Sequence, residues 1–214
     1  MKLVNLNNPY LTTRILILSF LILSFSVLTG FVMHEGIKSF ELAVYSALSQ
    51  FTRPTMTDIM VFITNLGSTV AIVLLNIVII ALPLTRRVFG LSVAVNSIIS
   101  AILNSVLKRI FARKRPNVKR FVIESGFGFP SGHTMNSTAL YTIILLAVFK
   151  QTNSSIIRIL VLMISVIAPF SIGISRIYLG VHQAGDVIGG WIMGVTVAIL
   201  VDTIFSVVKL SYVK

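Results

Sequence analysis

The chain alternates between long uncharged stretches and short segments in which basic, acidic and histidine residues gather. A helix that crosses a bilayer needs about 20 consecutive, mostly apolar residues. Six stretches match or approach this length, and we expect one span in each. They cover residues 15–33, 59–85, 88–107, 134–149, 159–175 and 187–208. The pattern therefore predicts an all-α fold, an integral membrane bundle of six transmembrane helices with both termini on the same side.

The second and third stretches adjoin closely. Residues 59–85 are long enough to tilt or to kink, and the kink is expected near Gly67 and Pro83. Only the short Arg86-Arg87 turn separates this stretch from the next, so the third helix should run antiparallel to the second.

A further helix is expected between the first two spans. Apolar residues recur there at spacings of three and four, at Ile37, Phe40, Val44, Leu48 and Phe51. This spacing is typical of an amphipathic helix. One interpretation is an interfacial helix that lies on the membrane with Lys38 and Glu41 facing water. The other is an ordinary helix within a loop.

Small residues recur in and just before the sixth stretch. Gly185 with Gly189, and Gly190 with Gly194, each have the GxxxG spacing. This spacing favours close helix packing within the bundle, and a dimer face is the alternative. No other pattern bears on the oligomeric state. Asp202 also lies in this stretch, and a position near the membrane interface accounts for it without a functional role.

The composition agrees with a membrane protein. The 214 residues are 56% apolar and only 11% charged, whereas soluble domains carry about 25% charged residues. The absence of cysteine excludes disulfides and cysteine-bound metals. Without linkers, repeats or low-complexity tracts, residues 1–214 are expected to form a single domain.

The charge balance is strongly basic. Eighteen Lys and Arg residues against six Asp and Glu residues give a net charge of +12. Nucleic acid is excluded as a partner, because the uncharged stretches are too long for a nucleic-acid-binding module. The basic residues should therefore serve the membrane surface, an anionic substrate, or both. Their distribution between the two sides does not decide the orientation in the membrane.

Three polar segments interrupt the apolar chain. They are residues 108–116, 130–133 and 175–186. The first follows the third span, the second precedes the fourth, and the third joins the fifth and sixth spans. Because successive spans alternate in direction, all three segments should meet at the same face of the membrane.

The basic members of these segments suit a phosphate group. Lys108, Arg115 and Arg176 supply three positive charges that would bind phosphate and stabilise charge developing during its transfer. Ser131 comes just before a helix, where Ser is a favoured N-cap. The backbone N–H of Gly132 would then lie at a helix N-terminus, which is a natural anion site.

Two histidines and one carboxylate suit nucleophilic catalysis. His182 and Asp186 are four residues apart and share one face if that segment is helical. The carboxylate would hold the imidazole in one tautomer and stabilise its positive form, so His182 is the candidate nucleophile. His133 is the candidate general acid that protonates the leaving oxygen. The remaining histidine, His34, lies outside the three polar segments.

A metal site is not expected, and no cofactor is implied. Two-metal phosphatase sites need several carboxylates, yet among the acidic residues only Glu124 and Asp186 lie near the three segments. Basic residues at helix ends are usually membrane-interface anchors. This interpretation applies to five of them here, Arg109, Arg113, Lys114, Lys119 and Arg120. Phe127 and Phe129 are candidates to line the mouth of the site.

The three segments resemble the signature of the type 2 phosphatidic acid phosphatase superfamily. That signature reads Lys-x6-Arg-Pro, then Pro-Ser-Gly-His, then Ser-Arg-x5-His-x3-Asp, and every position is matched in order between Lys108 and Asp186. The resemblance implies that His182 becomes phosphorylated, that Asp186 supports it and that His133 donates the leaving-group proton. It also implies phosphate contacts from five residues, Lys108, Arg115, Ser131, Gly132 and Arg176.

The resemblance also implies what the enzyme does and where. The expected activity is metal-independent hydrolysis of a lipid phosphate, such as phosphatidylglycerophosphate, phosphatidic acid or undecaprenyl pyrophosphate. A lipid phosphotransferase that uses the same intermediate with another acceptor is the alternative. The expected location is the bacterial plasma membrane, with the site at the extracytoplasmic face.

Overall fold

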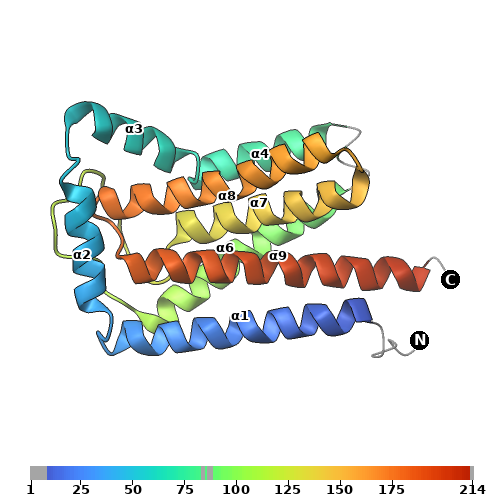
Figure 1. The fold of residues 1–214 in the computed structure, drawn as a ribbon, viewed down its shortest axis with the longest axis horizontal. Coiled ribbons are helices and arrows are strands. Elements are labelled where there is room, and N and C mark those ends of the chain that lie inside the picture. The colour runs from blue at the N-terminus through green and yellow to red at the C-terminus, as the bar shows by residue number, and fades with distance from the viewer. Residues whose placement is uncertain (1–8, 83–84, 86–88, 213–214) are drawn as a thin grey trace.

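The structure, a computed structural model, describes residues 9–82, 85 and 89–212, and its regular structure is helical in these residues (Figure 1). The all-α prediction is therefore confirmed. The helices are α1 (Pro9–Met33), α2 (Lys38–Ser49), α3 (Pro54–Asn65), α4 (Thr69–Ala81), α6 (Leu91–Phe111), α7 (Gly132–Gln151), α8 (Ser155–Tyr178) and α9 (Ala184–Tyr212).

The long helices coincide with the predicted membrane spans. Within the described residues, α1, α6, α7, α8 and the part of α9 up to Val208 are each long and apolar enough to cross a bilayer, and α3 with α4 makes a sixth candidate. Most helices extend beyond the predicted stretches by a few residues. This places Lys108 in the last turn of α6 and Asp186 in the first turn of α9.

The second span is not one continuous helix. The expected stretch 59–85 divides into α3 and α4, which meet at an angle of 48°. The break includes Gly67, where a kink was expected, and Ser68, whose hydroxyl accepts a hydrogen bond from the Ala71 N–H at 3.2 Å and so caps α4. Pro83, the other expected kink, and the Arg86-Arg87 turn lie outside the described residues.

The centre of the bundle is formed by α7 and α9, which pack along one another, with α1, α6 and α8 around them (Figure 1). Gly194 permits this close approach, because a Cβ added there would lie 2.6 Å from the Met135 backbone oxygen. A Cβ at Gly190 would likewise lie 3.0 Å from the backbone oxygen of Ser131, just before α7. The small residues therefore serve packing within the bundle, which confirms that interpretation of their spacing.

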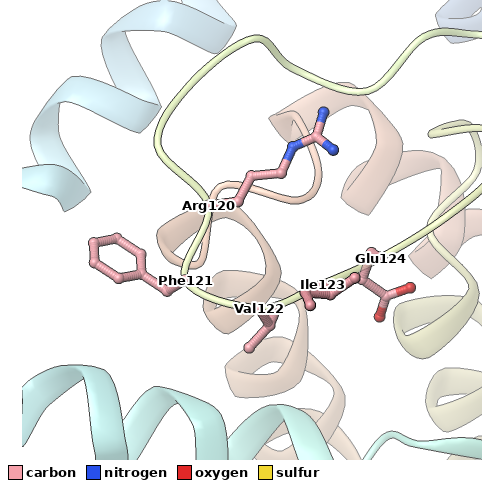
Figure 2. Close-up of a pocket in the computed structure, with 5 residues that line it drawn as sticks. All are labelled: Arg120, Phe121, Val122, Ile123 and Glu124. Carbon is pink, nitrogen blue, oxygen red and sulfur yellow. The ribbon is translucent and has the colours of Figure 1, made fainter.

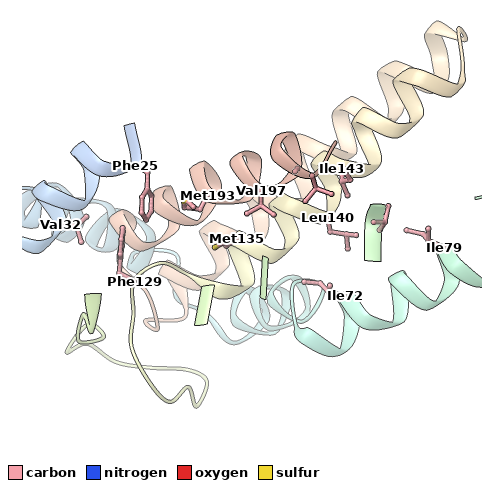
Figure 3. Packing of buried hydrophobic residues seen from close by; sticks show 13 residues of the cluster. Phe25, Val32, Ile72, Ile79, Phe129, Met135, Leu140, Ile143, Met193 and Val197 are labelled. Carbon is pink, nitrogen blue, oxygen red and sulfur yellow. The ribbon is translucent and has the colours of Figure 1, made fainter. Parts of the chain in front are cut away.

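The largest group of buried apolar side chains runs along the interior of the bundle (Figure 3). At one end, the Phe25 and Phe129 rings stack with their centroids 5.5 Å apart, and Phe111 meets Phe129 edge-on. Phe129 is fully buried in this group, so the expectation that it lines the mouth of the site is wrong. Phe127, by contrast, is 40% exposed.

The helix expected between the first two spans is α2, which lies across one end of the bundle, at the left of Figure 1. Its apolar residues Val44 and Leu48 pack against the ends of α8 and α9. Lys38 faces outward and pairs with Glu35 at 2.7 Å. The expectation that Glu41 also faces water is wrong: its side chain is buried and bonded to Arg113 from another segment.

A cluster of charged residues surrounds Asp202, toward the other end of α9 from Asp186. Asp202 is 16 residues beyond Asp186, which is about 24 Å along a helix. It is buried, and it pairs with Lys150 of α7 at 2.5 Å and with Arg14 of α1 at 3.1 Å. Asp202 therefore joins three helices through ion pairs, rather than simply lying at an interface as the sequence suggested.

Candidate active site

The three polar segments meet at the end of the bundle that α2 covers. The 112–131 loop is joined to the turn between α8 and α9 by backbone hydrogen bonds, from Phe121 N–H to Leu179 O at 3.1 Å and from Ser131 N–H to Asp186 O at 2.9 Å. The turn itself requires Gly180. This residue has φ +71°, and a Cβ there would lie 2.1 Å from Lys119 O.

His182 lies between a carboxylate and a guanidinium. Its Nδ1 is 3.3 Å from Asp186 Oδ2, and its Nε2 is 3.2 Å from Arg115 Nη1. An ionised carboxylate only accepts hydrogen bonds and a guanidinium only donates them. The neutral imidazole therefore carries its proton on Nδ1, and the lone pair of Nε2 points toward Arg115.

The environment keeps this imidazole neutral. Burial lowers the pKa of His182 to about 4, although the hydrogen bond and the negative charge of Asp186 act in the opposite direction. At neutral pH Nε2 therefore carries no proton, and its lone pair accepts the hydrogen bond from Arg115 Nη1.

Asp186 is completely buried, and both of its carboxylate oxygens accept hydrogen bonds. Its Oδ2 also accepts the Gln183 N–H at 2.9 Å, and its Oδ1 accepts Arg113 Nη1 at 2.6 Å. The second contact was not expected, because Arg113 was interpreted as a membrane-interface anchor. That interpretation is wrong, since the guanidinium lies inside the protein and contacts two carboxylates, those of Asp186 and Glu41.

Arg113 remains protonated although it is largely buried. Burial by itself would lower the pKa of Arg113, but its hydrogen bonds to Glu41 and Asp186 and their negative charges raise that pKa above the ordinary value. Glu41 Oε1 in addition accepts the Gly185 N–H at 3.0 Å. A carboxylate of α2 is therefore connected to the first turn of α9.

Arg115 and Arg176 approach each other around Glu124. Arg115 Nη2 is 3.6 Å from Glu124 Oε2, and Arg176 Nη2 forms a short hydrogen bond with Glu124 Oε1. Burial tends to raise the pKa of Glu124, but the positive charge of Arg176 and its hydrogen bond to Glu124 outweigh burial and keep that pKa below its ordinary value. Glu124 is therefore an anion between the two guanidinium groups.

Arg176 is the deepest of the cations. It is almost fully buried in α8, and its Nη1 donates to the Thr64 hydroxyl at the end of α3, at 2.8 Å. Its Nε, also buried, has no hydrogen-bond partner among the described residues. A buried donor without a partner is rare in proteins, and an oxyanion beside it would satisfy it.

Backbone carbonyl groups of the 112–131 loop accept hydrogen bonds from Lys108 and Arg115. Lys108 Nζ donates to Phe127 O at 3.0 Å. Arg115 donates from Nε to Gly126 O at 3.0 Å and from Nη2 to Ser125 O at 2.8 Å. Residues 125–127 thus bring Lys108 and Arg115, which come from the end of α6 and from the loop, close to one another.

Ser131, Gly132 and His133 begin α7. Ser131 is buried at the N-cap position, but its hydroxyl accepts a hydrogen bond from the Thr134 hydroxyl at 2.9 Å and does not cap the helix. A Cβ at Gly132 would lie 2.9 Å from Asn104 Oδ1, so only Gly fits there without displacing Asn104. His133 follows in the first turn of α7, within electrostatic reach of Glu124.

Two cavities open beside these residues. One, of about 290 Å³, is lined by the five residues from Arg120 to Glu124 (Figure 2). The other, of about 210 Å³, lies between α2 and the loop and reaches His182 and Gln183. His182 and the Glu124 anion therefore each border a space that a ligand or water could enter.

The structure brings together most of the residues that the sequence singled out. His182 contacts Asp186 and Arg115, and Arg176 joins Arg115 through Glu124. Sequence reasoning missed the roles of four residues in these contacts: Glu41, Thr64, Arg113 and Glu124. Arg113 and Glu124 lie in or near the polar segments, so a search for paired charges there would have found them. Nothing in the sequence points from Glu41 or Thr64 to this site.

The chain is similar to several known proteins. Residues 89–208 match the family model of the PAP2 superfamily. The chain is 33% identical to phosphatidylglycerophosphatase B of Bacillus subtilis, over 85% of this chain and 91% of that protein. It is 29% identical to the undecaprenyl-diphosphatase of Sulfolobus acidocaldarius, over 87% of each.

A solved structure has the same fold. The crystal structure of a transmembrane PAP2-type phosphatidylglycerolphosphate phosphatase from Bacillus subtilis superimposes with a TM-score of 0.80 and 30% sequence identity. The match covers 88% of this chain and 96% of that one. The likeness therefore extends over most of both chains.

Proposed function

Because the chain belongs to the PAP2 superfamily, we propose that this integral membrane protein hydrolyses a phosphomonoester or pyrophosphate of a lipid through a phosphohistidine at His182. The observation that carries the proposal is the position of this imidazole. Asp186 holds the proton on Nδ1, and Nε2 faces Arg115, a donor suited to a phosphate oxygen.

The reaction has two steps. In the first, the lone pair of His182 Nε2 attacks phosphorus, the bond from phosphorus to the lipid oxygen breaks, and His133 gives that oxygen a proton. In the second, water attacks phosphorus and gives a proton to His133, the phosphorus–nitrogen bond breaks, and phosphate leaves. Asp186 stabilises the positive imidazole between the two steps.

The phosphate would be held by cations and by a helix N-terminus. Lys108, Arg115 and Arg176 supply the positive charge, and the unpartnered Nε of Arg176 supports a phosphate oxygen beside it. Ser131 and Gly132 would add a hydroxyl and a backbone N–H from the start of α7. These donors neutralise the developing charge without a metal ion.

Phosphatidylglycerophosphate is the first substrate to test, because the Bacillus subtilis relative is named for it and shares 33% identity over most of both chains. Undecaprenyl pyrophosphate and phosphatidic acid are the further candidates. We place the protein in the bacterial plasma membrane with its site at the extracytoplasmic face, in keeping with the expectation from the family.

Phosphate release by the purified, detergent-solubilised protein tests the proposal. Each of the three lipids is offered with excess chelator, and His182→Ala is the control. Release that survives chelation and disappears in the variant is the expected result. Equal release by His182→Ala would overturn the mechanism, and transfer to another acceptor without free phosphate would replace hydrolysis by phosphotransfer.

A further inference from the structure

A buried row of charged groups leads from α2 to the imidazole of His182. Glu41 of α2 contacts Arg113 of the loop, with Oε2 2.7 Å from Nη2 and Oε1 3.1 Å from Nη1. Arg113 contacts Asp186 Oδ1 at 2.6 Å, and Asp186 Oδ2 is 3.3 Å from His182 Nδ1. Glu41 has a relative exposure of 4% and Asp186 of 0%, so water screens this row only weakly.

Arg113 by itself would oppose the chemistry proposed for His182. The imidazole becomes positive when it takes up the phosphoryl group, and Asp186 stabilises that charge. A guanidinium 2.6 Å from the same carboxylate already neutralises it. Arg113 and the positive imidazole would therefore compete for one negative charge.

The carboxylate of Glu41 balances the charge of Arg113, so that Arg113 no longer competes with the positive imidazole for Asp186. With Glu41 and Asp186 ionised and Arg113 protonated, the row carries a net charge of −1 while His182 is neutral and zero when His182 is positive. Without the charge of Glu41, the corresponding values are zero and +1. Burial makes the second arrangement unfavourable, because an uncompensated charge in a poorly solvated site is costly.

The fold places Glu41 specifically for this contact. The apolar side chains of α2 pack against α8 and α9, and the Gly185 N–H, one residue before Asp186, donates to Glu41 Oε1 at 3.0 Å. Glu41 is therefore fixed relative to the first turn of α9. Apart from the contact of Arg115 Nη1 with His182 Nε2, the donors of Arg115, Arg176 and Lys108 are bonded to loop carbonyls, Val181 O, Thr64 and Glu124.

We propose that Glu41 is a positioning residue that takes up the charge of Arg113, so that Asp186 remains a net negative partner for His182 during phosphoryl transfer. The inference rests on the proposed phosphatase activity, which it deepens. It predicts that Glu41 acts on the rate of the chemical step and leaves the binding of the substrate phosphate unchanged.

Glu41→Gln removes the charge with little change of shape. Its amide oxygen can still accept from the Gly185 N–H and from Arg113 Nη1, whereas the amide NH2 replaces the oxygen that accepts from Arg113 Nη2. We expect kcat to fall roughly 10-fold, as an unscreened charge near the reacting group affects the barrier, with KM within about twofold of wild type. Glu35→Gln is the matched control. Glu35 lies six residues earlier and pairs with Lys38 on the surface, where water screens its charge, so its variant should retain wild-type kcat.

A double variant separates charge balance from simple loss of a contact. Glu41→Gln combined with Arg113→Gln restores the wild-type net charge of the row. We expect its kcat to exceed that of Glu41→Gln by at least about threefold, since the competing guanidinium is gone. A purely structural contact predicts the opposite, because the double variant loses more of the network than the single one.

Thermal unfolding in detergent confirms that each variant is folded before its rate is compared. A folded Glu41→Gln protein with wild-type kcat would overturn the inference, as would a raised KM with unchanged kcat or a double variant slower than the single one. These results leave the proposed function standing, provided the wild-type protein releases phosphate. Wild-type protein without any release would overturn the proposed function and the inference together.

Discussion

Replacing Asp186 by Asn reverses the hydrogen-bonding pattern around His182. Arg113 donates to Oδ1 at 2.6 Å, and it would hold the amide oxygen at that position. The amide NH2 would then face the Gln183 N–H and His182 Nδ1, which both donate to Oδ2 in the native protein. The imidazole could only avoid this clash by moving its proton to Nε2, which would remove the nucleophilic lone pair and place two donors against each other at Arg115.

The electrostatic loss is also large. Two unit charges separated by the 3.3 Å between Asp186 Oδ2 and His182 Nδ1 attract each other by roughly 5 kcal/mol at an effective dielectric constant near 20. The amide dipole of the substituted side chain would retain part of this attraction. The shift of the His182 proton to Nε2 would lower the rate further, because it removes the nucleophilic lone pair. We expect kcat to fall on the order of 10³-fold, which corresponds to about 4 kcal/mol. KM should change little, because the phosphate-binding cations remain.

Steady-state phosphate release measures both constants. Asp202→Asn is the matched control, since Asp202 is another buried carboxylate of α9, bonded to Lys150 and Arg14 away from the site. Its kcat should equal that of wild type. If Asp186→Asn kept more than about a tenth of wild-type kcat while remaining folded, the assigned tautomer and the role of the carboxylate would both be refuted.

Four more outcomes are expected. Since burial lowers the pKa of His182 to about 4, the acid limb of kcat/KM should have an apparent pKa well below 6.5, and a limb at 6.5 would contradict the buried imidazole. His182 takes up a proton below pH 6.5 in the unfolded chain but only near pH 4 in the folded protein. The free energy of unfolding should therefore fall as the pH drops from 6.5 to about 4, because the unfolded state binds the extra proton. Thr64→Val leaves Arg176 Nη1 without its partner and should raise KM roughly fivefold, with kcat nearly unchanged, in the same assay. Gly194→Ala places a Cβ 2.6 Å from Met135 O and should lower the thermal midpoint through about 1–3 kcal/mol of overpacking; an unchanged midpoint would show that α7 and α9 adjust freely.

The helices were predictable because a bilayer imposes a simple rule on the chain. Each span must be apolar over its length, so gaps between charges mark the helices directly. The break between α3 and α4 is harder to predict in detail. Gly67 indicated a kink, but the 48° bend also depends on the Ser68 cap and on packing against α8, which only the folded chain shows.

The site was predictable where the chemistry is local in sequence. His182 and Asp186 are four residues apart, so helical geometry alone indicates that they interact. Glu41 and Arg113 are 72 residues apart, and their contact depends on how α2 lies across the bundle. Phe129 shows the same difficulty for apolar residues, since its neighbour Phe127 is exposed while Phe129 itself packs on Phe25.

Net charge was an incomplete guide to this site because it does not show how the charges are paired. The total charge of the chain is +12. At one end of the bundle, four cations lie with three carboxylates: Lys108, Arg113, Arg115 and Arg176 with Glu41, Glu124 and Asp186. Arg113 is bonded to Glu41 and Asp186, whereas Arg115 and Arg176 share the single carboxylate of Glu124. Excess positive charge is therefore concentrated at Arg115, Arg176 and Lys108, where the phosphate is proposed to bind. Around Asp186 the negative charges outnumber the positive one, which is the balance that a positive His182 requires.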